Sequence, residues 1–273
     1  MKVEPTGESI PEPPLRRRLS MANISFLLFL VLVVASLPVV AGSGRQVNPV
    51  EQFGRFAEAF FPPDLTVLPS VLSALWETIQ IAAMATLAGV AVSIVLGFAA
   101  ARGIAPRWLV FLMRFVMNGI RTLPSLIWAL LAVAMLGANS LAGVAALSMY
   151  SVGYLGKFFS EAFESLDLEV VRGLRQLGAG RLQAFQYGLW PSVRPLIWSH
   201  TLWMLEYNIR SASIIGYVGA GGIGLQLLRY QEFGQWDRFA TVLICIFVIV
   251  IGLDAVSGWV RRQLVSDAGG PSA

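Results

Sequence analysis

The chain has 273 residues, of which 56% are apolar and 13% charged, with a net charge of +4. A soluble domain carries roughly 25% charged residues, so this composition excludes an ordinary soluble enzyme, a disordered chain and a disulfide scaffold. One cysteine, Cys245, and one histidine, His200, exclude a Cys-rich metal site and leave almost nothing for a Ser-His-Asp triad. We therefore expect an all-helical integral membrane protein.

Six segments are apolar enough to cross a bilayer, for which a helix needs about 20 residues. In chain order they are residues 24–41, 68–101, 123–137, 141–159, 193–218 and 239–259. The third is short unless its helix begins near Phe115. A tight turn at Gly137, Asn139 and Ser140 makes the third and fourth an antiparallel pair.

The remaining segments complete the predicted domain organisation. Residues 1–20 contain several prolines and are expected to form a flexible cytoplasmic tail. Residues 21–67 hold the first span and an outer amphipathic helix that ends at Pro62. The transmembrane domain itself covers 68–264, and 265–273 form a second cytoplasmic tail. The basic residues before the first span also fit a cleaved secretory signal, but its apolar run is longer than a usual signal core, which favours a retained anchor.

The positions of lysine and arginine predict the orientation, because basic loops resist translocation. With a cytoplasmic N-terminus, 15 of the 20 basic residues lie in inner segments, four lie in outer segments, and Arg210 lies within a span. This asymmetry predicts that both termini are cytoplasmic. It also explains the basic charge without a nucleic-acid partner.

A basic amphipathic loop, residues 165–191, joins the fourth and fifth spans on the cytoplasmic side. One face of its first predicted helix is apolar, and the other is polar with Arg172, Arg175 and Gln176. Gly178 ends this helix, a second short helix begins at Arg181, and Pro191 opens the fifth span. The spacing alone fits either a docking knob for a partner or an interfacial loop bound by lipid head groups.

Four glycines, Gly219, Gly221, Gly222 and Gly224, satisfy the GxGxxG pattern of dinucleotide-binding proteins. That pattern requires a preceding buried strand and a following crossover helix. Here it follows a hydrophobic span on the predicted outer side, so we exclude an NAD site. Glycines permit positive φ and close approach, so the chain can turn back into the membrane where it lines a protein cavity. A simple loop between two spans is the alternative.

Two charged residues of the fifth span, Glu206 and Arg210, are spaced i, i+4 in the order that favours a helix pair. Arg210 lies roughly 28 Å along the helix from Pro191, near the predicted outer face. An ionisable group inside a span normally faces protein or water. Arg210 therefore either lines a pathway and attracts an anionic substrate, or forms a neutralised pair that fixes the helix against its neighbour.

The loop at 165–191 resembles the EAA loop of ABC importer membrane subunits, in which EAA, three residues, Gly, nine residues and I-x-L-P follow in order. Gly178 and Pro191 have the required separation. The EAA positions hold Arg172, Gly173 and Leu174, and Glu169 lies just before them. The resemblance implies that this loop is the coupling helix, which sits in a groove of an ATPase subunit. The implied docking residues are Glu169, Arg172, Gly173, Leu174, Arg175, Gly178, Arg181 and Pro191.

A second resemblance concerns the substrate. Residues 205–228 closely resemble the membrane subunit of phosphonate importers and their phosphite-importing relatives, as do 121–130, 157–163 and 253–264. The resemblance implies a type I ABC importer permease fold with six transmembrane helices in the bacterial cytoplasmic membrane. It also implies a second permease copy, two ATPase subunits that bind ATP and Mg, and an external binding protein. Phosphonate is the implied substrate, and phosphite or another oxyanion is the alternative.

The sequence contains no G-x-x-x-x-G-K-S/T phosphate loop. It therefore predicts a transport subunit with no ATPase site, catalytic residue or cofactor of its own.

In the family, the glycine-rich segment closes the outer end of the pathway. A secondary carrier, which would use intramembrane acids as proton or ion sites and would need no docking loop, is the less favoured function.

Overall fold

The computed structural model describes residues 21–41, 48–165 and 168–268. The predicted tail at 1–20 lies outside these residues, as do residues 269–273 of the second tail. The chain divides into two units, up to Gly54 and from Arg55. The first contains α2 (Met21–Ala41), which covers the first predicted span, and the beginning of α3 (Pro49–Phe60), which covers the predicted outer amphipathic helix.

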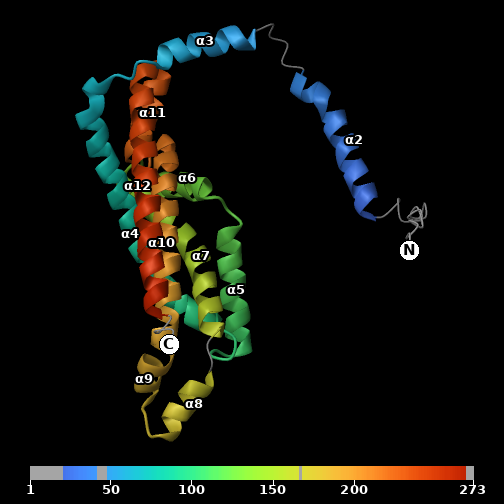
Figure 1. Ribbon diagram of the computed structural model, residues 1–273, viewed down its shortest axis with the longest axis vertical. Helices are drawn as coiled ribbons and strands as arrows, with labels where there is room; N and C mark the ends of the chain where they lie inside the picture. The colour runs from blue at the N-terminus through green and yellow to red at the C-terminus, as the bar shows by residue number, and fades with distance from the viewer. Residues whose placement is uncertain (1–20, 42–47, 166–167, 269–273) are drawn as a thin grey trace, which may run out of the picture. The chain divides into compact units, whose positions relative to one another are not determined.

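The second unit is built of helices throughout its described part (Figure 1). After α3 and the short η1 (Leu65–Val67), its elements in chain order are α4 (Leu68–Ala100), α5 (Arg107–Arg121), α6 (Ser125–Leu136), α7 (Ser140–Glu164), α8 (Leu168–Gln176), α9 (Arg181–Ala184), η2 (Phe185–Leu189), α10 (Trp190–Ile215), η3 (Gly216–Val218), α11 (Ile223–Glu232) and α12 (Trp236–Ala268). The all-helical architecture expected from the composition is confirmed for the described residues.

Length and composition mark three membrane-spanning helices in the described part of the chain: α2, α4 with η1, and α12. Two bent pairs also qualify when each is taken as one span, α5 with α6 and α10 with α11. Helix α7 does not meet these criteria, although it lies inside the bundle. The described residues thus give three to five spans by this measure, and the six-span topology stays a prediction.

The third predicted span is not a straight helix. Helices α5 and α6 are bent by 88° where the chain passes from Arg121 to Pro124. Proline lacks an N–H, and it disfavours the helical conformation at the residue before it, so Pro124 begins α6 rather than continuing α5. The third predicted segment therefore forms the short helix α6 of 12 residues and is not extended toward Phe115, because α5 runs in a different direction.

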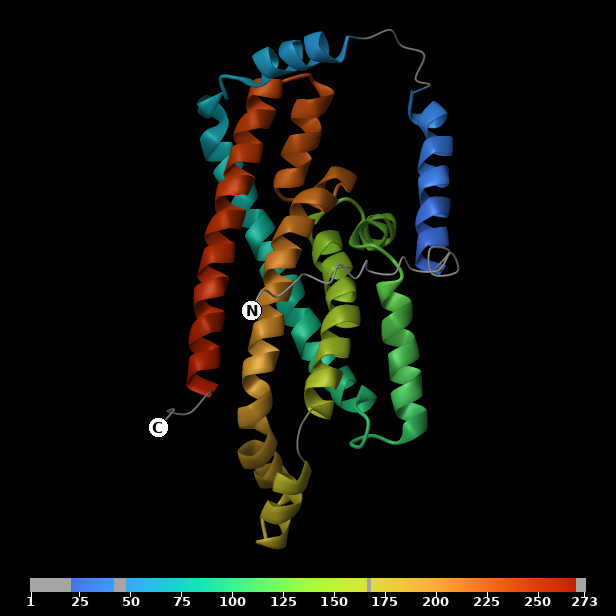
Figure 2. The same cartoon turned by 45° about the vertical axis from the view of Figure 1, so that its right-hand side comes forward.

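Helix α4 packs against α7 along the centre of the unit (Figure 2). Small residues make this approach close: a Cβ added to Gly89 would lie 2.6 Å from Ser151 Cβ, and one added to Gly97 would lie 2.9 Å from Phe159 Cβ. Membrane helices associate through such small residues because lipid provides no hydrophobic drive between helices. The pair α4–α7 therefore forms the rigid centre on which the other helices lie.

A buried polar cluster joins α10 to this centre. Asn208 is fully buried, and its Nδ2 donates hydrogen bonds of 2.9 Å to Thr86 Oγ1 on α4 and to Ser151 Oγ on α7. Since a buried amide is costly unless it is hydrogen-bonded, this cluster fixes both the depth and the rotation of α10.

The first turn of α12 is tied to the segment before α4. Arg238 Nε donates to Asp64 Oδ2 at 3.0 Å, and Thr241 Oγ1 donates to the carbonyl oxygen of Asp64 at 2.8 Å. Hydrogen bonds from the Thr66 hydroxyl and N–H, together with Arg238, lower the pKa of the Asp64 carboxyl. These contacts align the first turns of α4 and α12, the two longest helices of the second unit.

Candidate coupling loop and pathway break

The predicted cytoplasmic loop forms a projection at one end of the second unit, where α8 and α9 lie (Figure 1). Helix α8 ends at Gln176, and Gly178 follows with φ +91°. The backbone N–H of Gly178 donates to Arg175 O and that of Ala179 to Leu174 O, both at 3.1 Å. Glycine adopts this left-handed conformation without steric penalty, and it turns the chain sharply toward α9.

The surface of this projection combines arginines with exposed apolar side chains. Arg172 and Arg175 are exposed on α8. Leu177 is 86% exposed and Tyr187 71% exposed. Leu174 packs instead onto the following turn, where a Cβ added to Gly188 would lie 3.0 Å from Leu174 Cδ1. Val170 also lies beside Gly188, so Val170 and Leu174 share the predicted apolar face. Leu177 does not belong to this face, because α8 ends at Gln176.

The other predicted loop residues lie where the sequence placed them. Glu169 is in the first turn of α8, and Gly173 is exposed in the same helix with open space around it. Arg181 begins α9, and Pro191 is exposed in the first turn of α10. The five-residue η2 turn runs directly into α10. The projection is thus joined to α10 without an intervening loop.

Glu206 and Arg210 do not pair with each other. Glu206 Oε1 accepts from Arg261 at 3.2 Å, and Arg210 donates to Asp254 Oδ1 at 3.2 Å. Both partners belong to α12, and Glu206 is buried. The expected i, i+4 pair is therefore wrong: α10 turns both charges toward α12, where each finds an opposite charge. The signal was present in the sequence, because Asp254 and Arg261 also belong to a largely apolar helix.

The contact with Asp254 places Arg210 along the length of α12. Its partner Asp254 follows Trp236, the start of α12, by 18 residues, about 27 Å of helix. The beginning of α10 follows the projection directly, and α11 continues the chain beyond the glycine break. The predicted position of Arg210 near the outer face stays a prediction.

The glycine-rich segment is a break within a span rather than a loop that turns back. Helix α10 ends at Ile215, and the chain continues through η3 into α11 with a bend of only 44° (Figure 2). Gly219, Gly221 and Gly222 have φ values of +88°, +79° and +72°. The chain thus uses positive φ to change helix axis while it continues in the same general direction.

This break is packed tightly against α4 and α7. A Cβ added to Gly222 would lie 2.5 Å from Thr78 Oγ1, and one added to Gly221 would lie 2.8 Å from Ser140 Oγ and 2.9 Å from Glu77 Oε1. Gly224 is closer still to its own chain, because its Cβ would lie 2.2 Å from the carbonyl oxygen of Ser213. Side chains at these positions would force the break away from the centre of the bundle.

The polar groups of the break are satisfied by protein atoms. The N–H of Ile223 donates to Thr78 Oγ1 at 2.8 Å, while the N–H of Gly219 donates to Gly216 O at 3.0 Å. Ser140 Oγ donates to the Glu77 carboxylate beside the break. Irregular backbone is tolerated at membrane depth only where protein or water satisfies it, and α4 and α7 meet this requirement.

Arg121 is a residue whose placement the sequence did not predict. The sequence places Arg121 among the basic residues of the inner segments, yet it follows Arg107 by 14 residues, about 21 Å along α5. Its guanidinium carbon lies 4.5 Å from the centroid of the Tyr154 ring, and its Nε is buried without a hydrogen-bond partner in the described part of the chain. Pro124 is the signal in the sequence for this placement, because the chain changes direction between Arg121 and α6.

No group of three or more His, Cys, Asp or Glu side chains could hold a metal ion among the residues that the structure describes. The candidate site therefore consists of two connected parts, the projection built by α8 and α9 and the glycine break between α10 and α11. Helix α10 joins them.

Comparison with known proteins gives the relatives of this chain. It is 36% identical over 244 residues to the phosphite transport system permease protein PtxC of Stutzerimonas stutzeri, covering 89% of each chain. It is 31% identical to the phosphate-import permease protein PhnE of Mycolicibacterium smegmatis, over 92% of this chain and 48% of that one. It is 38% identical to the putative cryptic phosphonate transport system permease protein PhnE2 of Escherichia coli, over 44% of this chain and 98% of that one.

Solved structures show the same fold. A chain of the MetNI methionine ABC transporter in inward-facing conformations matches with a TM-score of 0.65 at 17% identity, covering 74% of this chain and 99% of that one. A chain of an amino acid ABC transporter with histidines matches with a TM-score of 0.61 at 18% identity, covering 73% and 96%. The type I importer permease fold expected from the sequence is thereby confirmed.

The family is shown by a match that covers most of the chain. Residues 93–266, which include the projection and the glycine break, match the family described as "Binding-protein-dependent transport system inner membrane component". Together with the relatives above, this match confirms the resemblance found in the sequence. The chain belongs to this family of inner membrane components and is a permease subunit of the ABC importer type.

Proposed function

We propose that the chain translocates phosphonate across the bacterial cytoplasmic membrane, with phosphite or another oxyanion as the alternative substrate. The observation that carries this proposal is the similarity to permeases named for phosphite, phosphate and phosphonate transport, which for PtxC extends over 89% of the chain. These substrates are all small phosphorus oxyanions. A single kind of pathway, shaped for a tetrahedral anion, would serve each of them.

Energy for this transport comes from partner subunits. The sequence contains no phosphate-binding loop of its own, so ATP and Mg bind in ATPase subunits and not in this chain. An external binding protein supplies the substrate, and a second copy of this chain completes the pathway. The excess of basic residues in the inner segments supports cytoplasmic termini and a cytoplasmic position for α8 and α9.

The projection is proposed to be the coupling helix that docks on the ATPase. Its exposed Leu177 and Tyr187 offer apolar contacts to a groove, and Arg172 and Arg175 offer charge-assisted ones. Movement of the ATPase would displace α8 and α9, and η2 would transmit this displacement to α10. These exposed side chains come from two separate elements, α8 with the residue after it and η2. They form a shaped surface of the kind that fits a groove, so they support docking on a protein more than binding to lipid.

The glycine break is proposed to be the gate. It lies at the far end of α10 from the projection, and its close contacts with Thr78 and Ser140 can form or separate as α10 moves. Glu206 and Arg210 stabilise the register of α10 against α12 just below the break. The Arg210 side chain lines a groove of about 630 Å³ that is otherwise mostly apolar. This surrounding favours a structural role for Arg210 over attraction of an anion.

The substrate is tested by uptake into membrane vesicles that contain the complete transporter with its binding protein. We expect uptake of labelled methylphosphonate that requires ATP and is suppressed by excess phosphonate or phosphite, but not by sulfate. Dissipating the proton gradient should leave it unchanged while ATP is present. Uptake that needs the gradient and not ATP would show a secondary carrier, and competition by sulfate alone would contradict the phosphorus oxyanion.

The coupling role is tested at Gly178. Valine there would strain the left-handed turn by roughly 1–2 kcal/mol, which corresponds to about a 5- to 30-fold loss of the docked conformation. We expect Gly178→Val to reduce uptake and substrate-stimulated ATP hydrolysis together, with normal amounts of the subunit in the membrane. Gly234→Val is the matched control, since Gly234 also has positive φ, +66°, but lies next to α12 at the other end of the unit. Full uptake by Gly178→Val would contradict coupling through this turn.

The gate is tested at Gly222. Gly222→Ala places a Cβ against Thr78, and overpacking of this kind costs about 1–3 kcal/mol. Gly234→Ala introduces a Cβ at positive φ with nothing within 4 Å, so it separates backbone strain from crowding. We expect Gly222→Ala to lower the melting temperature of the purified complex and the uptake rate well below those of Gly234→Ala. Equal behaviour of the two variants would show that the close approach to Thr78 has no role.

A further inference from the structure

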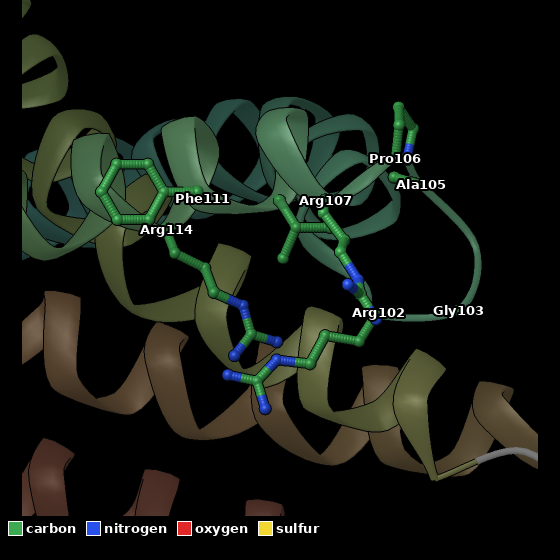
Figure 3. A pocket seen from close by; sticks show the side chains of 8 residues that line it. Arg102, Gly103, Ala105, Pro106, Arg107, Phe111 and Arg114 are labelled. Carbon is green, nitrogen blue, oxygen red and sulfur yellow. The ribbon is translucent and has the colours of Figure 1, made fainter.

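A pocket lies where α4 turns into α5, apart from both the projection and the glycine break. Its volume is about 690 Å³. Three arginines contribute to its lining, together with apolar and backbone surface (Figure 3). The residues relevant here are Arg102, Pro106, Arg107, Val110, Phe111 and Arg114.

The pocket has an excess of positive charge. Arg114 forms an ion pair with Glu164 of α7, and its Nε donates to the carbonyl oxygen of Ala100 at 3.1 Å. The Glu164 carboxylate also accepts the backbone N–H of Arg102. The guanidinium groups of Arg102 and Arg107 have no carboxylate partner among the residues that the structure describes. Of the three guanidinium groups that line the pocket, only that of Arg114 is therefore paired with a carboxylate of the described residues.

The arginine side chains converge. Figure 3 shows the Arg102 and Arg114 side chains running toward each other below the turn, with Arg107 above them. Like charges brought together repel one another unless an anion lies between them. Guanidinium groups present paired donors that match the oxygens of a phosphate group. The chemistry of the pocket therefore suits a phosphate-bearing anion.

An apolar strip begins at the rim of the pocket. Trp108, Phe111 and Phe115 on α5 are 68%, 74% and 68% exposed. The rings of Phe111 and Phe115 are stacked with centroids 6.5 Å apart. A free inorganic anion makes no favourable contact with such a strip, whereas a lipid places its acyl chains on apolar surface beside its head group. Basic pockets between membrane helices bind lipid head groups in this way.

The depth of the pocket agrees with a lipid. Helix α4 has 33 residues, about 50 Å of helix, which exceeds the roughly 30 Å of the hydrocarbon core. The α4–α5 turn therefore lies at or beyond the head-group region, while α5 runs back into the membrane. Trp108, in the first turn of α5, is typical of the interface.

We propose that this pocket binds the head-group phosphate of an anionic phospholipid, whose acyl chains lie along Trp108, Phe111 and Phe115. The proposal requires only that the chain spans a membrane. It does not depend on which oxyanion is transported. Because Glu164 is the last residue of α7, the bound lipid lies next to the end of this helix.

The test uses the complete transporter, purified and stripped of lipid. Phosphatidylglycerol or phosphatidylcholine is titrated in, and the lipid bound to each complex is counted by native mass spectrometry. We expect saturable binding of phosphatidylglycerol and little of phosphatidylcholine. Arg102→Gln with Arg107→Gln should weaken it about 30-fold, since each basic residue near the surface contributes roughly a factor of five. Arg102→Lys with Arg107→Lys should retain most of the binding.

The matched control is Arg194→Gln with Arg262→Gln, which removes the same charge from exposed positions on α10 and α12. It should leave phosphatidylglycerol binding unchanged. A second variant, Phe111→Ser with Phe115→Ser, should weaken lipid binding. Inorganic phosphate should not displace the lipid that this variant still binds. Because lipid is counted directly, this experiment can fail while oxyanion uptake is normal, or succeed while uptake is absent.

Four outcomes would overturn the proposal. Equal weakening by the control would show diffuse attraction rather than a site, and equal binding of phosphatidylcholine would show that the anion is not recognised. Displacement of the lipid by millimolar inorganic phosphate, with no effect of the phenylalanine variant, would assign the pocket to a free anion. A change in subunit stoichiometry in the glutamine variant would assign it to a contact between subunits.

Discussion

The hydrogen bond from the N–H of Ile223 to Thr78 Oγ1 allows this chain to interrupt a helix inside its bundle. An unpaired backbone N–H at membrane depth costs several kcal/mol, so a break between α10 and α11 needs a partner at the right place on a neighbouring helix. Thr78 meets this need, and Gly222 lets the backbone come close enough to reach it. The same contact fixes the break to α4, the helix that also forms the centre of the bundle with α7.

Helix α10 is the element that combines the functional parts. Its first turn follows η2 directly, its C-terminal half is fixed by Asn208 and by ion pairs with α12, and its last turn leads into the break. These polar contacts hold α10 in a defined register against α4, α7 and α12. A change in the partners of Glu206 or Arg210 would accompany any large shift of α10 against α12.

The helices themselves were largely predictable from the sequence. The segment 68–101 corresponds to α4, and 141–159 lies within α7, because long apolar runs end at turns with clear signals such as Asn139. The bend at Pro124 was not predicted, since hydropathy alone cannot distinguish one helix from two that meet at 88°. The partners of Glu206 and Arg210 were also missed, because they lie on α12, far away in the sequence. The glycines correctly indicated positive φ, but the direction of the chain beyond them depends on packing against α4 and α7.

In the proposed mechanism, movement of the projection opens and closes the glycine break. Ala138 is exposed and adjacent to the break, because a Cβ added to Gly219 would lie 2.9 Å from the Cβ of Ala138. Cys245 is the single native cysteine, so a Cys245→Ser background with Ala138→Cys reports on this position alone. In the complete transporter, the rate of thiol labelling at residue 138 should change several-fold between the ATP-free state and the ATP-trapped state. An unchanged labelling rate in a complex that hydrolyses ATP and takes up substrate would contradict this mechanism.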